Sequence, residues 1–482
     1  MSLRILAAAA LLAAGALPAL AELPATVTAR LAAAGIPEDA IGVVVKRLSD
    51  GKVIVAHGAE RSMQPASTLK LVTSLAALET LGPAFRGRAQ LRTAGSIVDG
   101  VLKGDLVLRG EGDVDLDWQA FQRMLRVVRL AGIRDVRGDF ILDRSAFTPA
   151  RTDVGVPPFD ETPEFRYNVI PDALLLNTNL LRLDIVSGER EVRLAMTPAL
   201  TGVTVAAEFE LVERACDDWE DGWVIPEVRA SGNGALRIVL RGTFPKECTV
   251  STAINVLDRV VFADRLFRSE WSRLGGTFRG RTRDGESPSG TRVLAQHRSR
   301  PLGEIVFDIN KDSDNPIARV VYLAMGANAG GKSAPTAQAS EREVRAWLAR
   351  KGIDGEGLVL ENGSGLSRSE RIRPSQLAAV LEAALASPWS PEFLASLPIV
   401  AVDGGMGKRL RGTPAAERSR IKTGTLRDVS AVAGYVKDDE GVTYVVVAML
   451  NHERAVKQVA RPILDALLEW VVAPRELARS PP

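Results

Sequence analysis

The spacing of apolar residues changes along the chain, and this change limits the fold that the chain can adopt. Both ends combine helical periodicity with short apolar strands, whereas residues 89–281 show short alternating runs broken by Gly, Asp and Pro, a pattern typical of β-strands. Helix-rich ends around a β-rich middle predict one α/β domain whose sequence is interrupted by a large insertion. The length of 482 residues leaves room for this arrangement, since it corresponds to roughly two to four domains.

The local patterns at the two ends are specific enough to assign elements. A β-hairpin is predicted around Ser49-Asp50-Gly51, and a helix is predicted to begin at Pro65 and to end near Gly82. After the middle region, helices are expected at 302–309, 316–325, 339–351, 374–386 and 455–472, and strands at 420–425, 431–436 and 442–450.

The first residues have the pattern of a signal peptide. Arg4 precedes an apolar run, and small residues up to Ala21 provide a cleavage site before Glu22. An uncleaved membrane anchor is the alternative, but the run is shorter than the roughly 20 residues that span a bilayer, and no later segment is long enough either. We therefore expect residues 1–21 to be removed and the mature protein to be soluble and periplasmic.

Charge and cysteine usage narrow the class of protein. The chain has 61 Lys+Arg against 59 Asp+Glu, and so small a net charge argues against a protein built around nucleic acid. In an oxidising compartment Cys216 and Cys248 can form a disulfide, which would contribute about 3 kcal/mol by the loop-entropy argument. The alternatives are a metal pair and a catalytic thiol, but the three histidines are scattered without ligand spacing. We expect a structural disulfide, no metal and no cofactor.

One Gly-rich segment fits a nucleotide-binding pattern. Residues 326–333 match G-x-x-x-x-G-K-[ST], which needs a strand before it and a helix that starts at its lysine. The preceding residues continue a helical run, and Pro335 follows closely. We interpret the segment as a Gly-rich loop.

A Ser-x-x-Lys motif can place a lysine amine against a serine hydroxyl when both residues lie on one helix. Ser49 and Lys52 span the hairpin turn and do not meet that condition. Ser67 and Lys70 open the helix after Pro65, where the backbone N–H of Ser67 also stays available for an oxyanion. Ser67 is the candidate nucleophile and Lys70 is its candidate base.

Two later motifs add to this pair. A Ser-x-Asn triplet occurs at 231–233, where flanking glycines indicate a turn, and again as Ser313-Asp314-Asn315 between two predicted helices. The segment Lys422-Thr423-Gly424-Thr425 lies in a predicted strand, where the glycine leaves room for a ligand backbone and the other side chains supply a charge and hydroxyl donors. Each motif alone has an ordinary explanation as a cap, a turn or a surface lysine, but the ordered set is a specific signal.

This ordered set resembles the signature of β-lactamases and penicillin-binding proteins. The long interval from Lys70 to Ser313 is similar to that of the class C low-molecular-mass penicillin-binding proteins, the D-alanyl-D-alanine carboxypeptidase/endopeptidase family, in which extra domains are inserted between the first two motifs. Val114 and Arg319 depart from the family pattern, which has Pro and Glu at these positions. Further segments that look like family landmarks are 110–113, 177–179, 297–302, 362–368 and 411–414.

The resemblance implies a fold and domain limits. The fold is expected to be α/β, of the serine β-lactamase/penicillin-binding-protein-like transpeptidase type, with an antiparallel sheet, helices and large β-rich inserted domains. The expected division is a signal peptide at 1–21, a penicillin-binding domain at 22–88 and 282–482, a first inserted domain at 89–164 and 266–281, and a nested second inserted domain at 165–265.

The resemblance also implies an activity. The expected reaction is hydrolysis of the terminal D-Ala-D-Ala bond of peptidoglycan stem peptides, with cleavage of crosslinks as a further activity, and β-lactams would acylate the same serine. Ser67 would attack, Lys70 would take its proton, and the N–H groups of Ser67 and Thr425 would stabilise the oxyanion. The other implied roles are proton relay by Ser313, contacts to substrate and Lys70 by Asn315, a positive charge from Lys422, and carboxylate binding by Thr423 and Thr425.

The resemblance further implies a pocket for the diamino side chain of the stem peptide, lined by Arg368 and Tyr167 with Asp160 or Glu161. A peripheral contact is the only membrane association expected. Two alternatives stay open. A β-lactamase shares the three motifs, although the chain has no Glu-x-x-Leu-Asn element and its middle motif begins with Ser. A non-catalytic peptidoglycan-binding protein would have no use for Lys70 beside Ser67.

Overall fold

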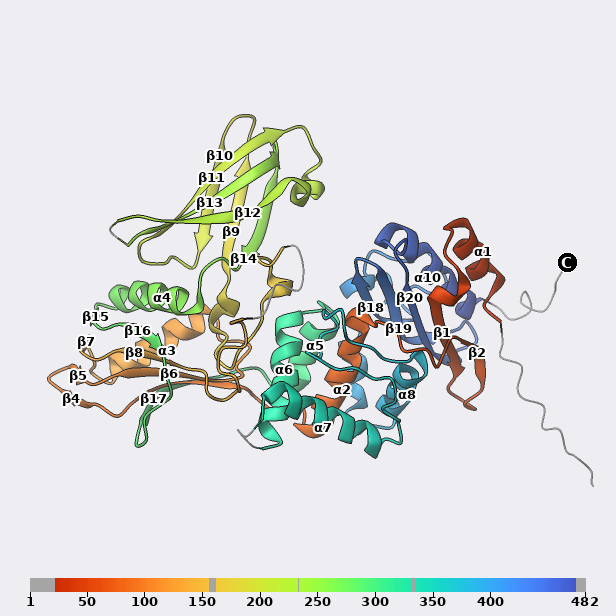
Figure 1. The fold of residues 1–482 in the computed structure, drawn as a ribbon, viewed down its shortest axis with the longest axis horizontal. Helices are drawn as coiled ribbons and strands as arrows, with labels where there is room; N and C mark the ends of the chain where they lie inside the picture. Colours follow the sequence, from red (N-terminus) through yellow and green to blue (C-terminus); the bar gives the residue numbers. More distant parts are fainter. Residues whose placement is uncertain (1–21, 156–161, 233, 331–333, 474–482) are drawn as a thin grey trace, which may run out of the picture.

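The computed structural model describes residues 22–155, 162–232, 234–330 and 334–473. The predicted signal peptide therefore lies outside the described residues. Figure 1 shows two parts side by side: both chain ends, in red and in teal to blue, form what we term the core body, and the middle of the chain, in orange to green, forms the inserted part.

The core body is built on one antiparallel sheet with the strand order β18-β19-β20-β1-β2. Alternation along β20 gives the sheet two apolar faces: Tyr444, Val446 and Ala448 pack in one cluster of buried side chains, and Val445 and Val447 pack in the other. The predicted hairpin is confirmed as β1 and β2. The strands are β1 (Ile41–Arg47), β2 (Val53–His57), β18 (Arg420–Leu426), β19 (Val429–Lys437) and β20 (Thr443–Asn451).

Helices cover both faces of this sheet, giving a layered α/β/α arrangement (Figure 1). The central helix α2 is buried from Lys70 to Leu78, so its polar side chains there need partners inside the protein. One face carries α1 (Ala25–Ala33) and α10 (Lys457–Val472). The other carries α2 (Lys70–Thr80), α5 (Leu302–Asn310), α6 (Asn315–Asn328), α7 (Thr336–Arg350), α8 (Pro374–Leu385) and α9 (Ser390–Ser396).

The Gly-rich segment at 326–333 follows a helix. The residues before Gly326 belong to α6, which continues to Asn328, so this segment lacks the preceding strand that a phosphate-binding loop requires. Lys332 and Ser333 lie outside the described residues.

The described residues of the inserted part form four small sheets, with the orders β16-β8-β6-β3-β17, β15-β7-β5-β4, β10-β9-β14 and β11-β13-β12. The first two use β3 (Arg88–Thr93), β4 (Ser96–Val98), β5 (Val101–Lys103), β6 (Leu106–Glu111), β7 (Asp135–Val136), β8 (Phe140–Asp143), β15 (Thr277–Phe278), β16 (Thr282–Asp284) and β17 (Arg292–Arg298). The other two use β9 (Leu181–Ser187), β10 (Val192–Thr197), β11 (Val203–Val212), β12 (Trp223–Ala230), β13 (Leu236–Pro245) and β14 (Thr249–Ile254).

The inserted part differs from the sequence-based expectation in two respects. It includes two helices, α3 (Trp118–Leu130) and α4 (Arg259–Arg273), within a region expected to be mostly β. Strand β17 also pairs with β3, so the sheet continues past residue 281, where the return to the core body was expected. We propose that the inserted part spans residues 88–298, with the strands of 181–254 as its nested unit.

The two cysteines form the predicted disulfide. Cys216 begins the 3₁₀ helix η5 (Cys216–Gly222), and Cys248 precedes β14, so the bond fastens an acidic turn to the sheets of the nested unit. No helix among the described residues is long and apolar enough to cross a membrane.

The two parts are packed against each other through an apolar contact. Val169 and Leu175 of the inserted part share one cluster of buried side chains with Val320 and Leu323 of α6. This contact places the inserted segment around residue 167 next to the N-terminus of α6.

The disulfide predicts a local effect on stability. Replacing both cysteines by serine should destabilise the nested unit by about 3 kcal/mol, because the unfolded chain then gains the freedom of an open loop. Urea unfolding followed by tryptophan fluorescence would measure this, since Trp219 and Trp223 lie in and beside η5. An unfolding curve unchanged between the double variant and the oxidised wild type would contradict the prediction.

Candidate active site

Ser67 lies at a strained turn that leads directly into the central helix. It belongs to η2 (Ala66–Leu69), and the residue before it, Ala66, has a φ of 46°, which is unusual for a residue with a side chain. Such strain persists only where surrounding packing enforces it, and it is frequent at functional sites. Ser67 itself is half-buried, so its hydroxyl can be reached from outside.

The Lys70 amine is enclosed by three polar partners. It lies 3.0 Å from Ser67 Oγ, and it donates hydrogen bonds to Asn315 Oδ1 at 2.5 Å and to the Ser364 carbonyl at 2.6 Å. The side chain has no solvent exposure. Burial lowers the pKa of Lys70 to about 7, against the opposing attraction of Asp314 and Glu370. Lys70 can therefore be neutral near physiological pH.

A second buried amine stands beside the first. Lys422 of β18 is 1% exposed and donates to Ser313 Oγ at 2.8 Å and to the Thr423 carbonyl at 3.0 Å. Burial, and then repulsion from Lys70, lowers the pKa of Lys422. Ser313 has a φ of 59°, so both serines of the site lie at or next to a strained residue.

Strand β18 runs alongside η2, and a glycine permits the close approach. A Cβ at Gly424 would lie 2.9 Å from the Ser67 nitrogen and 2.8 Å from the Pro65 carbonyl oxygen, which is too short for any side chain. Next to it, Thr423 is half-buried and Thr425 is exposed. The structure thus brings together all eight residues taken from the three motifs: Ser67, Lys70, Ser313, Asn315, Lys422, Thr423, Gly424 and Thr425.

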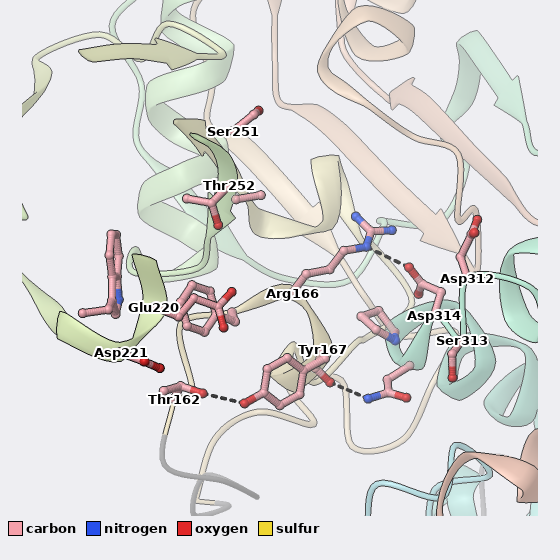
Figure 2. A pocket seen from close by; sticks show the side chains of 15 residues that line it. Thr162, Arg166, Tyr167, Glu220, Asp221, Ser251, Thr252, Asp312, Ser313 and Asp314 are labelled. Carbon is pink, nitrogen blue, oxygen red and sulfur yellow. Dashed lines mark hydrogen bonds and ion pairs between the residues drawn. The ribbon is translucent and has the colours of Figure 1, made fainter. Parts of the chain in front are cut away.

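The inserted part reaches this site through η3 (Arg166–Asn168). The Asn315 Nδ2 atom donates to the Tyr167 carbonyl at 3.0 Å, and Arg166 forms an ion pair with Asp314 at 2.7 Å, as Figure 2 shows. Asp314 also caps α6 by accepting from the Ile317 N–H. These contacts join Ser313-Asp314-Asn315 to the inserted part, and no sequence motif predicted them.

A cavity of about 730 Å³ adjoins Ser313 and Asn315 beneath the nested unit (Figure 2). Tyr167 lines it, and its hydroxyl hydrogen-bonds with that of Thr162. Arg368 lies on the segment that also carries Ser364, with its side chain exposed to solvent. Asp160 and Glu161, the other expected residues of the diamino pocket, lie outside the described residues.

The sequence analysis missed Ser364 and Glu370 as site residues. Ser364 contributes only its carbonyl, and Glu370 is fully buried behind it, where it accepts from backbone N–H groups. The Gly-Ser-Gly sequence at 363–365 indicates a tight turn, but it does not predict which carbonyl oxygen accepts a hydrogen bond from Lys70. Within the described ranges, no cluster of three or more His, Cys, Asp or Glu side chains could hold a metal ion.

The packing of Gly365 against η2 yields a prediction. A Cβ at Gly365 would lie 1.8 Å from the Ala66 carbonyl oxygen, so Gly365→Ala should displace η2 and reduce covalent labelling of Ser67 by fluorescent penicillin at least about 100-fold. Gly352→Ala is the matched control, because Gly352 has a similar positive φ but open space around it. The control should lose only about 1 kcal/mol of stability and keep its labelling rate. Equal labelling rates in the two variants would contradict the prediction.

Comparisons with known proteins agree with this geometry. The D-alanyl-D-alanine carboxypeptidase of Actinomadura sp. (strain R39) is 29% identical over 435 residues, which is 83% of this chain and 76% of that protein. The D-alanyl-D-alanine carboxypeptidase DacB of Haemophilus influenzae is 27% identical over 424 residues, which is 86% of each chain. The crystal structure of penicillin binding protein 4 (dacB) from Haemophilus influenzae matches with a TM-score of 0.75 at 24% identity, covering 92% of this chain and 99% of that chain.

The fold class expected for this chain is confirmed by the structural similarity. A model of the D-Ala-D-Ala carboxypeptidase 3 (S13) family matches residues 23–471 of this chain, which confirms the expected family. With nearly the whole chain matched, the protein belongs to this family and is a serine-type D-Ala-D-Ala carboxypeptidase.

Proposed function

We propose that the protein is an exported, periplasmic serine DD-peptidase that hydrolyses the terminal D-Ala-D-Ala bond of peptidoglycan stem peptides through an acyl-enzyme on Ser67. The observation that carries this proposal is the set of partners around the Lys70 amine. A neutral amine has two N–H donors and one lone pair, and the carbonyl oxygens of Asn315 and Ser364 take the two donors. The lone pair is then left for the Ser67 hydroxyl at 3.0 Å.

Acylation begins when Ser67 Oγ attacks the carbonyl carbon of the penultimate D-Ala and its proton passes to Lys70 Nζ. The N–H groups of Ser67 and Thr425 stabilise the oxyanion, an interaction worth about 3–4 kcal/mol per donor in serine hydrolases. The C–N bond then breaks, and the leaving D-Ala amine receives a proton through Ser313, whose hydroxyl accepts a hydrogen bond from Lys422. Water hydrolyses the resulting ester and regenerates the Ser67 hydroxyl.

The pair of buried amines supports recognition of an anionic substrate. Two ammonium groups this close repel each other, so in the free enzyme the site disfavours charging both Lys70 and Lys422. A terminal carboxylate bound by Thr423 and Thr425 would favour the charged form of Lys422. That charge in turn favours neutral Lys70, so substrate binding would prepare the base.

Room for a larger substrate supports the second activity in this proposal, cleavage of crosslinks. The cavity beside Ser313 opens under the nested unit, where the leaving side of a crosslinked dimer could extend. Tyr167 lines this cavity, and we propose that it, with Arg368 and Asp160, contacts the diamino side chain of the stem peptide. β-Lactams, as mimics of D-Ala-D-Ala, would acylate Ser67 by the same steps.

Ser67→Ala tests the central assignment. The variant should lose covalent labelling by fluorescent penicillin, and its release of D-Ala from a tripeptide ending in D-Ala-D-Ala should fall at least about 1,000-fold, because the nucleophile is absent. Ser49→Ala is the matched control, since Ser49 belongs to the rejected Ser-x-x-Lys motif, and it should behave like the wild type. Full activity in Ser67→Ala would disprove the acyl-enzyme on this residue.

The same experiment separates the alternatives. Hydrolysis of the penicilloyl-enzyme within seconds would identify a β-lactamase, and no labelling of the wild type at any concentration would identify a binding protein. Digestion of purified peptidoglycan, with products separated by mass, would show whether monomers lose D-Ala and whether crosslinked dimers disappear. Unchanged dimers would remove the crosslink-cleaving part of the proposal.

The pH dependence of acylation follows from the pKa of Lys70. Only neutral Lys70 can take the serine proton, and its pKa of about 7 lies below the ordinary value of 10.5. The acylation rate should therefore be near its maximum above pH 8 and fall about tenfold for each pH unit below 6. Stopped-flow acylation by a chromogenic β-lactam between pH 5 and 9 measures this limb. A rate that still rises about tenfold from pH 8 to pH 9 would contradict a buried, neutral Lys70.

A further inference from the structure

The Lys70 amine depends on a segment that has no regular secondary structure. This segment, residues 361–370, is here termed the lysine loop, and its Ser364 carbonyl accepts one of the two hydrogen bonds donated by Lys70 to carbonyl oxygens. A loop without a helix or sheet ladder must find other acceptors for its buried backbone N–H groups. What holds the lysine loop in place therefore decides where the Lys70 amine lies.

One carboxylate supplies most of these acceptors. Glu370 Oε1 accepts from the N–H groups of Glu361 at 3.2 Å, Asn362 at 2.9 Å and Gly363 at 2.9 Å. Its other oxygen, Oε2, accepts from the Gly365 N–H at 2.9 Å. The four donors flank Ser364 on both sides, so the Glu370 side chain determines the path of the backbone that presents the Ser364 carbonyl.

Glu370 fits this place as an anion. It is fully buried, which raises its pKa, while the backbone N–H groups favour the ionised form. Every partner in these bonds is a donor, so a proton on either oxygen would face another hydrogen. The lysine loop is thus built around a negative charge inside the protein.

Three further close approaches hold the lysine loop against α2, α6 and η2. Thr73 Oγ1, one turn beyond Lys70 on α2, donates to the Gly363 carbonyl at 2.6 Å. A Cβ at Gly363 would lie 2.7 Å from the ring of Tyr322, and one at Gly365 would lie 1.8 Å from the Ala66 carbonyl oxygen. The loop is clamped between α6 and η2, so a shift of its backbone changes the surroundings of Ser67 and Lys70 together.

Four charged side chains surround Lys70 in addition to this geometry. Asp314 and Glu370 attract its ammonium form, while Arg319 and Lys422 repel it. Arg319 lies one turn after Asn315 on α6, is 6% exposed and donates to the Val169 carbonyl. Burial lowers the pKa of Arg319 to about 10, and its charge attracts Glu370. It occupies the α6 position where the family pattern has Glu, so in this chain a buried cation stands near the buried Glu370.

We propose that Glu370 is a positioning residue for the carboxypeptidase reaction: it folds the lysine loop so that the Ser364 carbonyl holds Lys70 against Ser67, and Arg319 balances its charge around Lys70. The inference rests on the roles proposed above for Ser67 and Lys70. It adds that the two charges have opposite effects on the base: Glu370 raises the pKa of Lys70, and Arg319 lowers it.

The test is the pH profile of acylation by a chromogenic β-lactam, which yields a plateau rate and a midpoint. Glu370→Gln should lower the plateau at least about tenfold, because an amide cannot accept all four N–H groups, and it should move the midpoint down by about 0.5–1 pH unit. Glu370→Asp should lower the plateau and leave the midpoint in place, because the shorter side chain keeps the charge. Arg319→Met should move the midpoint up by about 0.5–1 unit, which at pH 6 is about a 3–10-fold slower reaction.

Two further variants separate position from charge. Thr73→Val removes one clamp of the lysine loop without changing any charge, so the plateau should fall and the midpoint should stay. Glu440→Gln removes an exposed charge in the turn between β19 and β20 and should leave both quantities unchanged. If Glu370→Gln does not fold, as judged by circular dichroism, Thr73→Val tests the position and Arg319→Met tests the charge.

Wild-type plateaus in the Glu370 variants and in Thr73→Val would overturn the positioning role. Midpoints that stay fixed, or move in the same direction, in Glu370→Gln and Arg319→Met would overturn the charge balance. Failure of the proposed function looks different, since Ser67→Ala would then still be labelled by penicillin.

Discussion

The active site depends on the burial of the Lys70 amine at the N-terminal end of α2, which favours its neutral form. Burial removes the water that would stabilise its ammonium form, and the amine must then satisfy its N–H groups with protein acceptors. Those acceptors come from distant parts of the chain: Asn315 on α6 and Ser364 on the loop before α8. The helices α2, α6 and α8 are packed so that their neighbouring segments converge on this desolvated nitrogen.

This requirement gives a physical reason for the strained residues at the site. Ala66 and Ser313 both have positive φ values, and each begins a segment that brings a polar group to one of the two buried amines. Relaxing either backbone would leave a buried polar group of the site without its hydrogen bond, at a cost of about 1–3 kcal/mol, which is as large as the strain itself. Gly365 and Gly424 also support this arrangement. They let the backbones of the lysine loop and of β18 contact the segment at Pro65 to Ser67, where any side chain would hold them apart.

Much of this arrangement could be predicted from the sequence, and the remainder could not, for definite reasons. The motif residues could be predicted because their side chains do the chemistry and their spacing is characteristic. The sheet of the core body and its helices other than α1 and α9 could be predicted from periodicity. Helix α3 was not predicted, although Phe121, Met124 and Leu125 follow a helical spacing, because the segments on both sides of it show the alternation typical of strands. The contacts through the carbonyls of Ser364 and Tyr167 involve no side-chain chemistry, so residue types carry little information about them.

The hydrogen bond to the Tyr167 carbonyl makes the backbone of the inserted part a component of the active site. The insertion gives the middle motif a main-chain acceptor, so the identity of residue 167 can change without loss of that hydrogen bond. Removing the insertion, however, would leave the buried Asn315 amide with an unmatched N–H group beside the amine that it orients. The inserted segment is therefore part of the active site through the position of its backbone, and a change that moves this backbone would disturb Asn315 even if every motif residue stayed the same.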